Sequence, residues 1–114
     1  MIIIYHNNRC SKSRKCLNFL KESKTDYKTI EYLKDKLSTN AIKDILSRLE
    51  GDIKDVIRVN EKDIRGLKID FESKEEVVDI ISKYKNCLQR PIIFVNNKYI
   101  VCRPPEKVLQ FIKK

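Results

Sequence analysis

Close to the amino terminus, the chain reads Ile2-Ile3-Ile4-Tyr5-His6-Asn7-Asn8-Arg9-Cys10-Ser11-Lys12-Ser13-Arg14. Residues 2–5 form a short, uninterrupted apolar run that ends in polar residues, which is typical of a buried strand. Residues 11–22 then change to a helical periodicity. The apolar face of this predicted helix carries Cys16, Leu17, Phe19 and Leu20. A strand, a short polar turn and a helix therefore open the chain, and Cys10 lies at the turn.

The middle of the chain is mostly helical by pattern. Residues 27–32 alternate β-favouring and polar side chains, which predicts a second strand. Residues 39–50 predict a helix that Ser38 or Thr39 can cap and that Gly51 follows, since helix ends favour glycine. The apolar positions of this helix are Ile42, Ile45, Leu46 and Leu49.

Residues 52–68 indicate only short helical turns with polar connections. The segment from Ser73 to Glu76 matches a capping box and predicts a further helix. The residues expected to face inward from that helix are Val77, Val78, Ile80, Ile81 and Tyr84.

Two strands and a final helix follow. Residues 91–95 and 98–102 are β-rich runs, and the Asn96-Asn97 pair between them predicts a hairpin turn. Pro104 and Pro105 lie at the start of a last helix, where proline is tolerated. The apolar face of that helix is expected to carry Val108, Leu109 and Ile112.

This order of elements predicts an α/β fold, with helices packed on a small mixed sheet. A first strand-helix unit with Cys10 at its turn, and a later strand that opens with Pro91, outline a thioredoxin/glutaredoxin-like fold. The length of 114 residues suits one ordinary domain. We therefore expect a single domain over residues 1–114, with a helical insertion over about residues 36–85.

Composition excludes several classes of protein. Hydrophobic residues make up 41% of the chain, with only 2 glycines and 3 prolines, so disordered and low-complexity readings fail. The formal net charge is +9, but acidic residues are interleaved with the lysines, as in Lys74-Glu75-Glu76. This pattern favours a solvated surface that attracts small anions over a nucleic-acid-binding stripe.

No apolar run has the length of a signal-peptide core or of a spanning helix. We therefore expect a cytoplasmic protein. In that compartment, the four cysteines are more often free thiols, ligands or catalytic groups than a disulfide scaffold.

Cys10 is the first candidate for chemistry. A thiolate between a strand and a helix faces unpaired backbone N–H groups and the positive end of the helix dipole, which lower the pKa of a cysteine. Arg9, Lys12 and Arg14 add positive charge nearby. The alternative is that Cys10 is only a small apolar residue at a strand end.

The motif from Cys10 to Ser13 is Cys-x-x-Ser, so it lacks the second thiol that could close a disulfide. Ser13 could instead donate a hydrogen bond to the thiolate or to a bound anion. An oxidised Cys10 would then need an external thiol. Cys16 and Cys102 are expected in the core, and the sequence does not place Cys87, although Cys16 or Cys87 could also serve as an alternative resolving group.

Three arginines are candidates for anion binding. Arg90 and Arg103 each directly precede a proline, and Arg58 lies in the irregular middle section. Guanidinium groups match tetrahedral oxyanions in a bidentate geometry that lysine cannot reproduce. Taken singly, each of them could also be an ordinary surface arginine.

Together, three motifs resemble the glutaredoxin-linked arsenate reductase family, an ArsC- and Spx-like branch of the thioredoxin-like superfamily. They are the segment from His6 to Arg14, the segment Gln89-Arg90-Pro91-Ile92-Ile93, and the segment Cys102-Arg103-Pro104-Pro105-Glu106. They occur in the family's order and cover essentially the whole chain.

The resemblance implies roles for individual residues. Cys10 would be the catalytic nucleophile, and an oxyanion such as arsenate would be bound by Arg58, Arg90 and Arg103. His6, Ser13 and Arg14 would support the thiolate, and Pro91 would be a cis-proline. The family uses glutathione as a co-substrate and glutaredoxin as a partner, with no bound cofactor and no metal.

Two alternatives stay open on the same scaffold. One is a thiol-disulfide reductase that acts on another substrate. The other is a regulator that resembles Spx and binds RNA polymerase, although such proteins use a Cys-x-x-Cys switch where this chain has Ser13.

Overall fold

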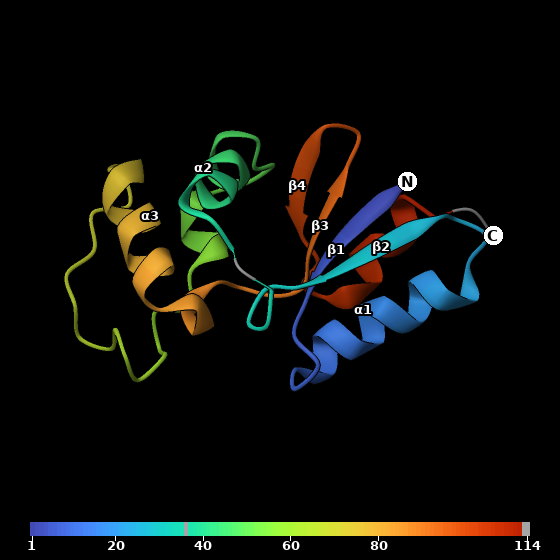
Figure 1. Cartoon of the computed structure of the whole chain (residues 1–114), viewed down its shortest axis with the longest axis horizontal. Coiled ribbons are helices and arrows are strands. Elements are labelled where there is room, and N and C mark those ends of the chain that lie inside the picture. The colour runs from blue at the N-terminus through green and yellow to red at the C-terminus, as the bar shows by residue number, and fades with distance from the viewer. Residues whose placement is uncertain (36, 113–114) are drawn as a thin grey trace.

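Four strands form a mixed sheet in the order β2-β1-β3-β4 in a computed structural model that describes residues 1–35 and 37–112 (Figure 1). The strands are β1 (Ile2–His6), β2 (Tyr27–Glu31), β3 (Ile92–Val95) and β4 (Lys98–Val101). β1 pairs in parallel with β2 and antiparallel with β3. The predicted small mixed sheet is confirmed.

Local sequence explains how these strands connect. The parallel pair needs a crossover, which the helix α1 (Ser11–Glu22) supplies. β3 and β4 form a hairpin whose turn residues, Asn96 and Asn97, have φ values of 52° and 63°. Asparagine tolerates this left-handed conformation better than most residues, so the predicted turn is confirmed.

One face of the sheet is covered by α1 and by the 3-10 helix η3 (Pro105–Gln110). The sequence pattern placed Leu109 on the apolar face of the last helix, but this residue is 45% exposed. A 3-10 helix has about three residues per turn, so Pro105, Val108 and Phe111 share the inward face and Leu109 turns to solvent.

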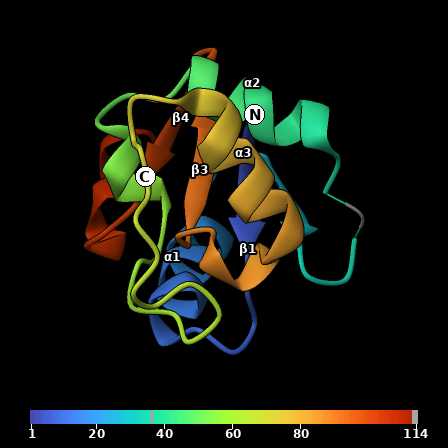
Figure 2. The same cartoon turned by 90° about the vertical axis from the view of Figure 1, so that its left-hand side faces the viewer.

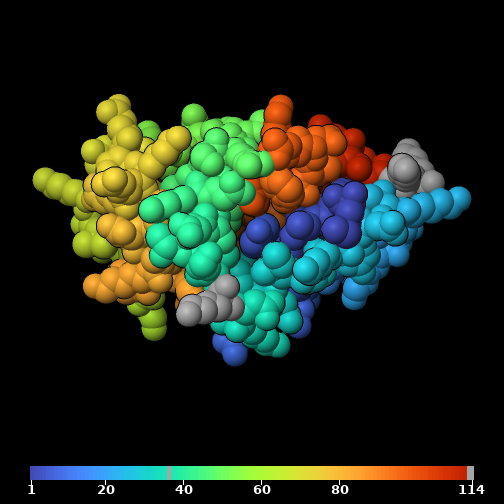
Figure 3. Space-filling view, turned by 45° about the horizontal axis from the view of Figure 1, so that its top comes forward, coloured from blue at the N-terminus to red at the C-terminus, as the bar shows by residue number. Residues whose placement is uncertain are grey.

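The segment between β2 and β3 is helical and lies at one end of the molecule (Figures 1 and 2). It contains α2 (Thr39–Ser47), η1 (Ile53–Val56), α3 (Lys74–Lys83) and η2 (Lys85–Cys87). The space-filling view shows the green helical segment against the orange hairpin without a break (Figure 3). Residue 36, where the insertion was expected to begin, and residues 113–114 of the expected domain lie outside the described residues.

The insertion and the second face of the sheet share one hydrophobic core. Its buried members include Tyr5, Tyr32, Ile42, Ile45, Val77, Ile81, Leu88, Ile92 and Tyr99. The Tyr99 hydroxyl also donates to Asp44 Oδ2 over 2.7 Å, which ties α2 to β4. The insertion is therefore held to the sheet by apolar packing and by a specific hydrogen bond.

Helix α2 ends earlier than predicted. Its last residue is Ser47, and Leu49 forms a β-bridge with Tyr99. The Glu50 N–H donates to the Tyr99 carbonyl over 2.9 Å. Leu49 and Glu50 therefore pair with β4 and do not continue the helix. Gly51, at φ 124°, consequently lies in the connection after the bridge and does not end the helix.

Both predicted helix caps form. The Ser38 Oγ accepts from the Ala41 N–H over 3.1 Å at the start of α2. The Ser73 Oγ accepts from the Glu76 N–H over 3.3 Å at the start of α3. These short polar side chains fix where the two helices of the insertion begin.

Candidate active site

Cys10 occupies the N-cap of α1, with an extended backbone at φ −95° and ψ 120°. Its N–H donates to the Asn7 carbonyl over 3.0 Å, and its carbonyl accepts from the Arg14 N–H over 3.0 Å. The side chain is half-buried. The structure thus places the thiol at the start of the helix, where the sequence predicted it.

The surroundings of the sulfur favour the thiolate. Burial by itself would raise the pKa of Cys10. The backbone N–H groups of Ser13 and Lys12 and the guanidinium of Arg90 outweigh burial, and together they lower the pKa of Cys10 below that of an ordinary cysteine. Cys10 therefore ionises more readily than an ordinary cysteine.

A buried hydrogen-bond network fixes the loop that precedes Cys10. His6 is 2% exposed, and its Nδ1 lies 2.6 Å from Ser13 Oγ while its Nε2 lies 2.9 Å from Asn8 Oδ1. An amide oxygen can only accept, so we assign the proton of a neutral ring to Nε2. Nδ1 then accepts from the Ser13 hydroxyl.

The contacts of Ser13 and Arg14 lie within the same loop. The Ser13 Oγ accepts from the Asn7 N–H over 3.1 Å and hydrogen-bonds His6 Nδ1 over 2.6 Å. Arg14 likewise donates to the Asn8 carbonyl over 2.8 Å. His6, Ser13 and Arg14 thus brace the loop, and it is the backbone N–H of Ser13 that faces the sulfur.

Arg90 is the cation that reaches Cys10. Its guanidinium lies beside the sulfur and helps to lower the pKa of Cys10, and its Nη1 donates to the Asn86 carbonyl over 2.9 Å. The Nε of Arg90 is buried and has no hydrogen-bond partner among the described residues. The Arg90–Pro91 peptide is cis, as predicted, and the Arg103–Pro104 peptide is cis as well.

Arg103 and Arg58 complete a basic cluster beside Arg90. Arg103 Nη1 donates to the Arg90 carbonyl over 2.9 Å. Arg58 Nη1 donates to Gln89 Oε1 over 3.0 Å, and its Nε lies 3.4 Å from Glu61 Oε2. Arg58 and Arg103 line one pocket of about 280 Å³, so the structure brings together arginines that are far apart in sequence.

Sequence reasoning missed Tyr32. This side chain is fully buried, and its hydroxyl contacts Arg90 and Asn7 and donates to the Leu88 carbonyl over 3.4 Å. A usable signal existed, because β1 and β2 are parallel and the residues after them meet at one sheet edge. Burial raises the pKa of Tyr32, so its hydroxyl is a neutral hydrogen-bonding group beside the site.

The other three cysteines are buried. A hydrogen bond with Cys102 and burial raise the pKa of Cys16 far above its ordinary value. Burial, with the charges of Glu61 and Asp63, raises the pKa of Cys87 to about 11. Cys16 and Cys102 lie in the core beneath the sheet, as predicted, and neither Cys16 nor Cys87 has the low pKa of a resolving thiol.

In residues 1–35 and 37–112, no three His, Cys, Asp or Glu side chains gather as a metal site. Across the same residues, no helix combines the length and the apolar character needed to cross a membrane.

Known proteins match this chain along most of its length. An "Arsenate reductase" of Haemophilus influenzae is 35% identical over 115 residues, covering 97% of this chain and 98% of the relative. The "Global transcriptional regulator Spx 1" of Lactococcus lactis is 28% identical over 95 residues, covering 82% of this chain and 74% of the relative.

The fold is also that of solved structures. The structure titled arsenate reductase from Vibrio cholerae superposes with a TM-score of 0.81 at 26% identity, covering 96% of this chain and 95% of that one. The sequence model of the ArsC family matches residues 5–111, which include Cys10 and all three arginines of the cluster. With its thioredoxin-like sheet and its Cys10 loop, this chain belongs to the ArsC family.

Proposed function

We propose that this protein is a cytoplasmic arsenate reductase that uses the Cys10 thiolate as its nucleophile and external thiols as its reductant. The observation that carries the proposal is the placement of a low-pKa Cys10 against Arg90, next to the pocket that Arg58 and Arg103 line. Arsenate is a tetrahedral anion, and guanidinium groups with helix N–H donors favour its binding. The names of the relatives support the same substrate.

In the first step, Cys10 Sγ attacks arsenic. A sulfur–arsenic bond forms, an arsenic–oxygen bond breaks, and the oxygen takes up protons and leaves as water. Arg58, Arg90 and Arg103 hold the remaining oxygens while charge develops on them. The N–H groups of Ser13 and Lys12 hold the sulfur in the geometry of attack.

External thiols complete the cycle. The thiol of glutathione displaces a second oxygen from arsenic as water and forms a second sulfur–arsenic bond. A thiol of glutaredoxin then attacks that glutathione sulfur, so that a mixed disulfide forms, the bond from glutathione to arsenic breaks and its electron pair reduces arsenic. Water finally displaces Cys10 from arsenic, so that arsenite leaves and Cys10 returns to its thiolate. In sum, one arsenate and two thiols give one arsenite, one disulfide and one water, and arsenic gains the two electrons that the two sulfurs lose.

The test is arsenate-dependent oxidation of NADPH, coupled through glutathione, glutaredoxin and glutathione reductase. We expect turnover in the wild type, none in Cys10→Ser, and near wild-type turnover in a folded Cys16→Ala variant. A folded wild type with a titratable low-pKa Cys10 but no arsenate-dependent oxidation would refute the proposal. If that enzyme instead reduced a glutathionylated peptide, it would be a thiol-disulfide reductase.

A second candidate is a regulator that binds RNA polymerase, which the similarity to Spx 1 supports. Ser13 argues against a dithiol switch at this position, because a hydroxyl cannot form a disulfide with Cys10. Retention of the RNA polymerase α subunit on the immobilised protein, together with absent arsenate turnover, is the result that would favour this candidate.

A further inference from the structure

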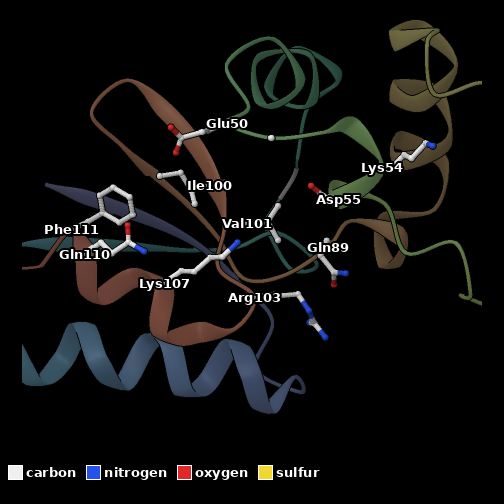
Figure 4. Close-up of a pocket in the computed structure, with 11 residues that line it drawn as sticks. Glu50, Lys54, Asp55, Gln89, Ile100, Val101, Arg103, Lys107, Gln110 and Phe111 are labelled. Atoms are coloured by element: carbon white, nitrogen blue, oxygen red, sulfur yellow. The ribbon is translucent and has the colours of Figure 1, made fainter.

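A cavity of about 580 Å³ lies between the insertion and the end of the sheet (Figure 4). Arg103, Lys107 and Gln110 line it from η3 and the segment before it. Glu50 and Asp55 line it from the insertion. Of the residues proposed above to bind arsenate, only Arg103 lines this cavity, so it is a separate space that adjoins the site.

Arg103 connects the cavity to the reacting sulfur. Its Nη1 is bound to the Arg90 carbonyl over 2.9 Å, and the Arg90 side chain contacts Cys10. Arg103 also lines the smaller pocket that contains Arg58. The larger cavity therefore adjoins the pocket of Arg58 and Arg103 through Arg103 itself.

The charges that face the cavity are incompletely paired. Among the residues that the structure describes, the Lys107 ammonium has no hydrogen-bond or ion-pair partner, and Figure 4 shows it directed across the cavity. Asp55 on the opposite wall accepts from the Asp52 N–H over 3.4 Å but has no cationic partner within the same described residues. Lys54, by contrast, lies over the Phe71 ring at 5.8 Å, and Lys98 neutralises Glu50 at 3.6 Å.

The proposed reaction requires a thiol that the chain does not supply near Cys10. Cys16 and Cys102 are buried in the core beneath the sheet, and Cys87 is buried as well. The second thiol must therefore come from outside. A free ammonium on one wall and a carboxylate without a cation on the other suit a ligand that carries both a carboxylate and an ammonium group.

We infer that this cavity is the docking subsite of the reductant, a small peptide thiol of the glutathione class, and that Lys107 binds its carboxylate. Asp55 faces the ligand's ammonium group, and the thiol extends past Arg103 toward the arsenic on Cys10. Gln110 is a further donor for the carboxylate. This inference rests on the proposed function, since it assigns the place from which the external thiol acts.

The first test measures binding without turnover. S-methylglutathione, whose sulfur is blocked, is titrated into the Cys10→Ser protein and followed by calorimetry and amide chemical shifts. We expect Lys107→Gln to weaken binding about fivefold, which corresponds to one charge-assisted hydrogen bond at a partly open site. Lys107→Arg should retain binding. The matched control is Lys21→Gln, because Lys21 lies near the far end of α1, away from the cavity.

The second test uses the coupled assay. In Lys107→Gln we expect a higher KM for glutathione and an unchanged KM for arsenate. Absent binding of S-methylglutathione, or equal affinity in wild type and Lys107→Gln, would overturn the subsite whatever the arsenate activity. Lys107-dependent binding in a protein that does not turn over arsenate would support the subsite and refute only the proposed function.

Discussion

At the scale of single residues, the function of Cys10 depends on groups that a helix terminus and one arginine supply together. Two backbone N–H groups and Arg90 overcome the effect of burial and lower the pKa of Cys10. The side chains of His6 and Ser13 hydrogen-bond each other and stabilise the loop that precedes Cys10. The sequence predicted the position of Cys10 at the start of α1 because a strand–helix turn is a local property.

Replacing Arg90 tests whether its positive charge lowers the pKa of Cys10. Arg90→Gln should raise the pKa of Cys10, because the lost positive charge no longer favours the thiolate. The pH midpoint for alkylation of Cys10 by iodoacetamide should move upward, so at neutral pH the variant reacts more slowly than the wild type. Arsenate turnover, as kcat/KM, should fall by about 10²–10³, the usual effect of losing one donor at a developing oxyanion.

The control for that change is Arg65→Gln, because Arg65 lies in an exposed loop and binds only the Asn60 carbonyl. It should leave both the alkylation midpoint and the turnover unchanged. Equal alkylation profiles in Arg90→Gln and wild type would contradict the electrostatic role of Arg90.

The hydroxyl of Tyr32 can be tested by removing it. Tyr32→Phe keeps the ring in the core but removes the hydroxyl that contacts Arg90, Asn7 and Leu88. We expect kcat/KM for arsenate to fall about fivefold and the free energy of unfolding to fall by about 1 kcal/mol, the net value of one hydrogen bond.

Because Tyr32 acts through Arg90, its substitution should also move the alkylation midpoint of Cys10. A loss of stability with no change in that midpoint would mean that the hydroxyl serves only the core. Tyr84→Phe is the matched control, since Tyr84 is partly buried in the same core and contacts Lys83 through its ring.

At the scale of elements, short polar signals determined where segments begin, and tertiary pairing determined where some of them end. Ser38 and Ser73 start their helices as predicted. Helix α2 stops at Ser47 because the chain beyond it pairs with Tyr99. The last helix adopts a 3-10 geometry, which its apolar pattern did not predict because spacings of three and four residues were both present.

The turn between β3 and β4 can be tested through the backbone conformation of Asn96. Asn96 has φ 52°, a conformation that costs a β-branched residue about 1–2 kcal/mol. Asn96→Val should therefore lower the free energy of unfolding in urea by about that amount, whereas Asn96→Gly should be nearly neutral. Equal losses for valine and glycine would show that the asparagine side chain, and not the backbone conformation, is what matters.

At the scale of the whole molecule, the insertion and the sheet act as one body because they share a hydrophobic core. Tyr99 of β4 bonds Asp44 of α2, and burial together with this hydrogen bond raises the pKa of Tyr99. The cavity proposed for the thiol lies between these two parts of the fold, with walls from both. Its geometry therefore depends on how firmly the insertion is held.

The raised pKa of Tyr99 predicts a loss of stability in alkali. An unfolded tyrosine loses its proton above about pH 10, while the folded Tyr99 keeps it, so the unfolded state binds fewer protons there. The free energy of unfolding should fall as the pH rises above that value, and Tyr99→Phe should reduce the slope. The variant should also be about 1–3 kcal/mol less stable at neutral pH, because Asp44 loses its partner.

Urea unfolding between pH 8 and 11 measures both effects. Tyr84→Phe is again the control and should leave the slope unchanged. A Tyr99→Phe variant with the wild-type slope would mean that the hydroxyl of Tyr99 is not protected in the folded state.

The sequence by itself determined the features that depend on neighbours in the chain. These are the buried first strand, the thiol at the start of α1, the helix caps and the Asn96-Asn97 turn. Each follows from backbone geometry or from the side chains of a few consecutive residues. The resemblance to a family added the three arginines, whose motifs are short and ordered along the chain.

Only the tertiary structure decided which of these groups meet. Arg58 and Arg103 are far apart in sequence, and they reach one pocket because the strand order β2-β1-β3-β4 and the packed insertion bring their loops together. Tyr32 reaches Arg90 in the same way, and Lys107 faces Asp55 across the cavity. Long-range contacts depend on the packing of the whole core, so no local pattern in the sequence could specify them.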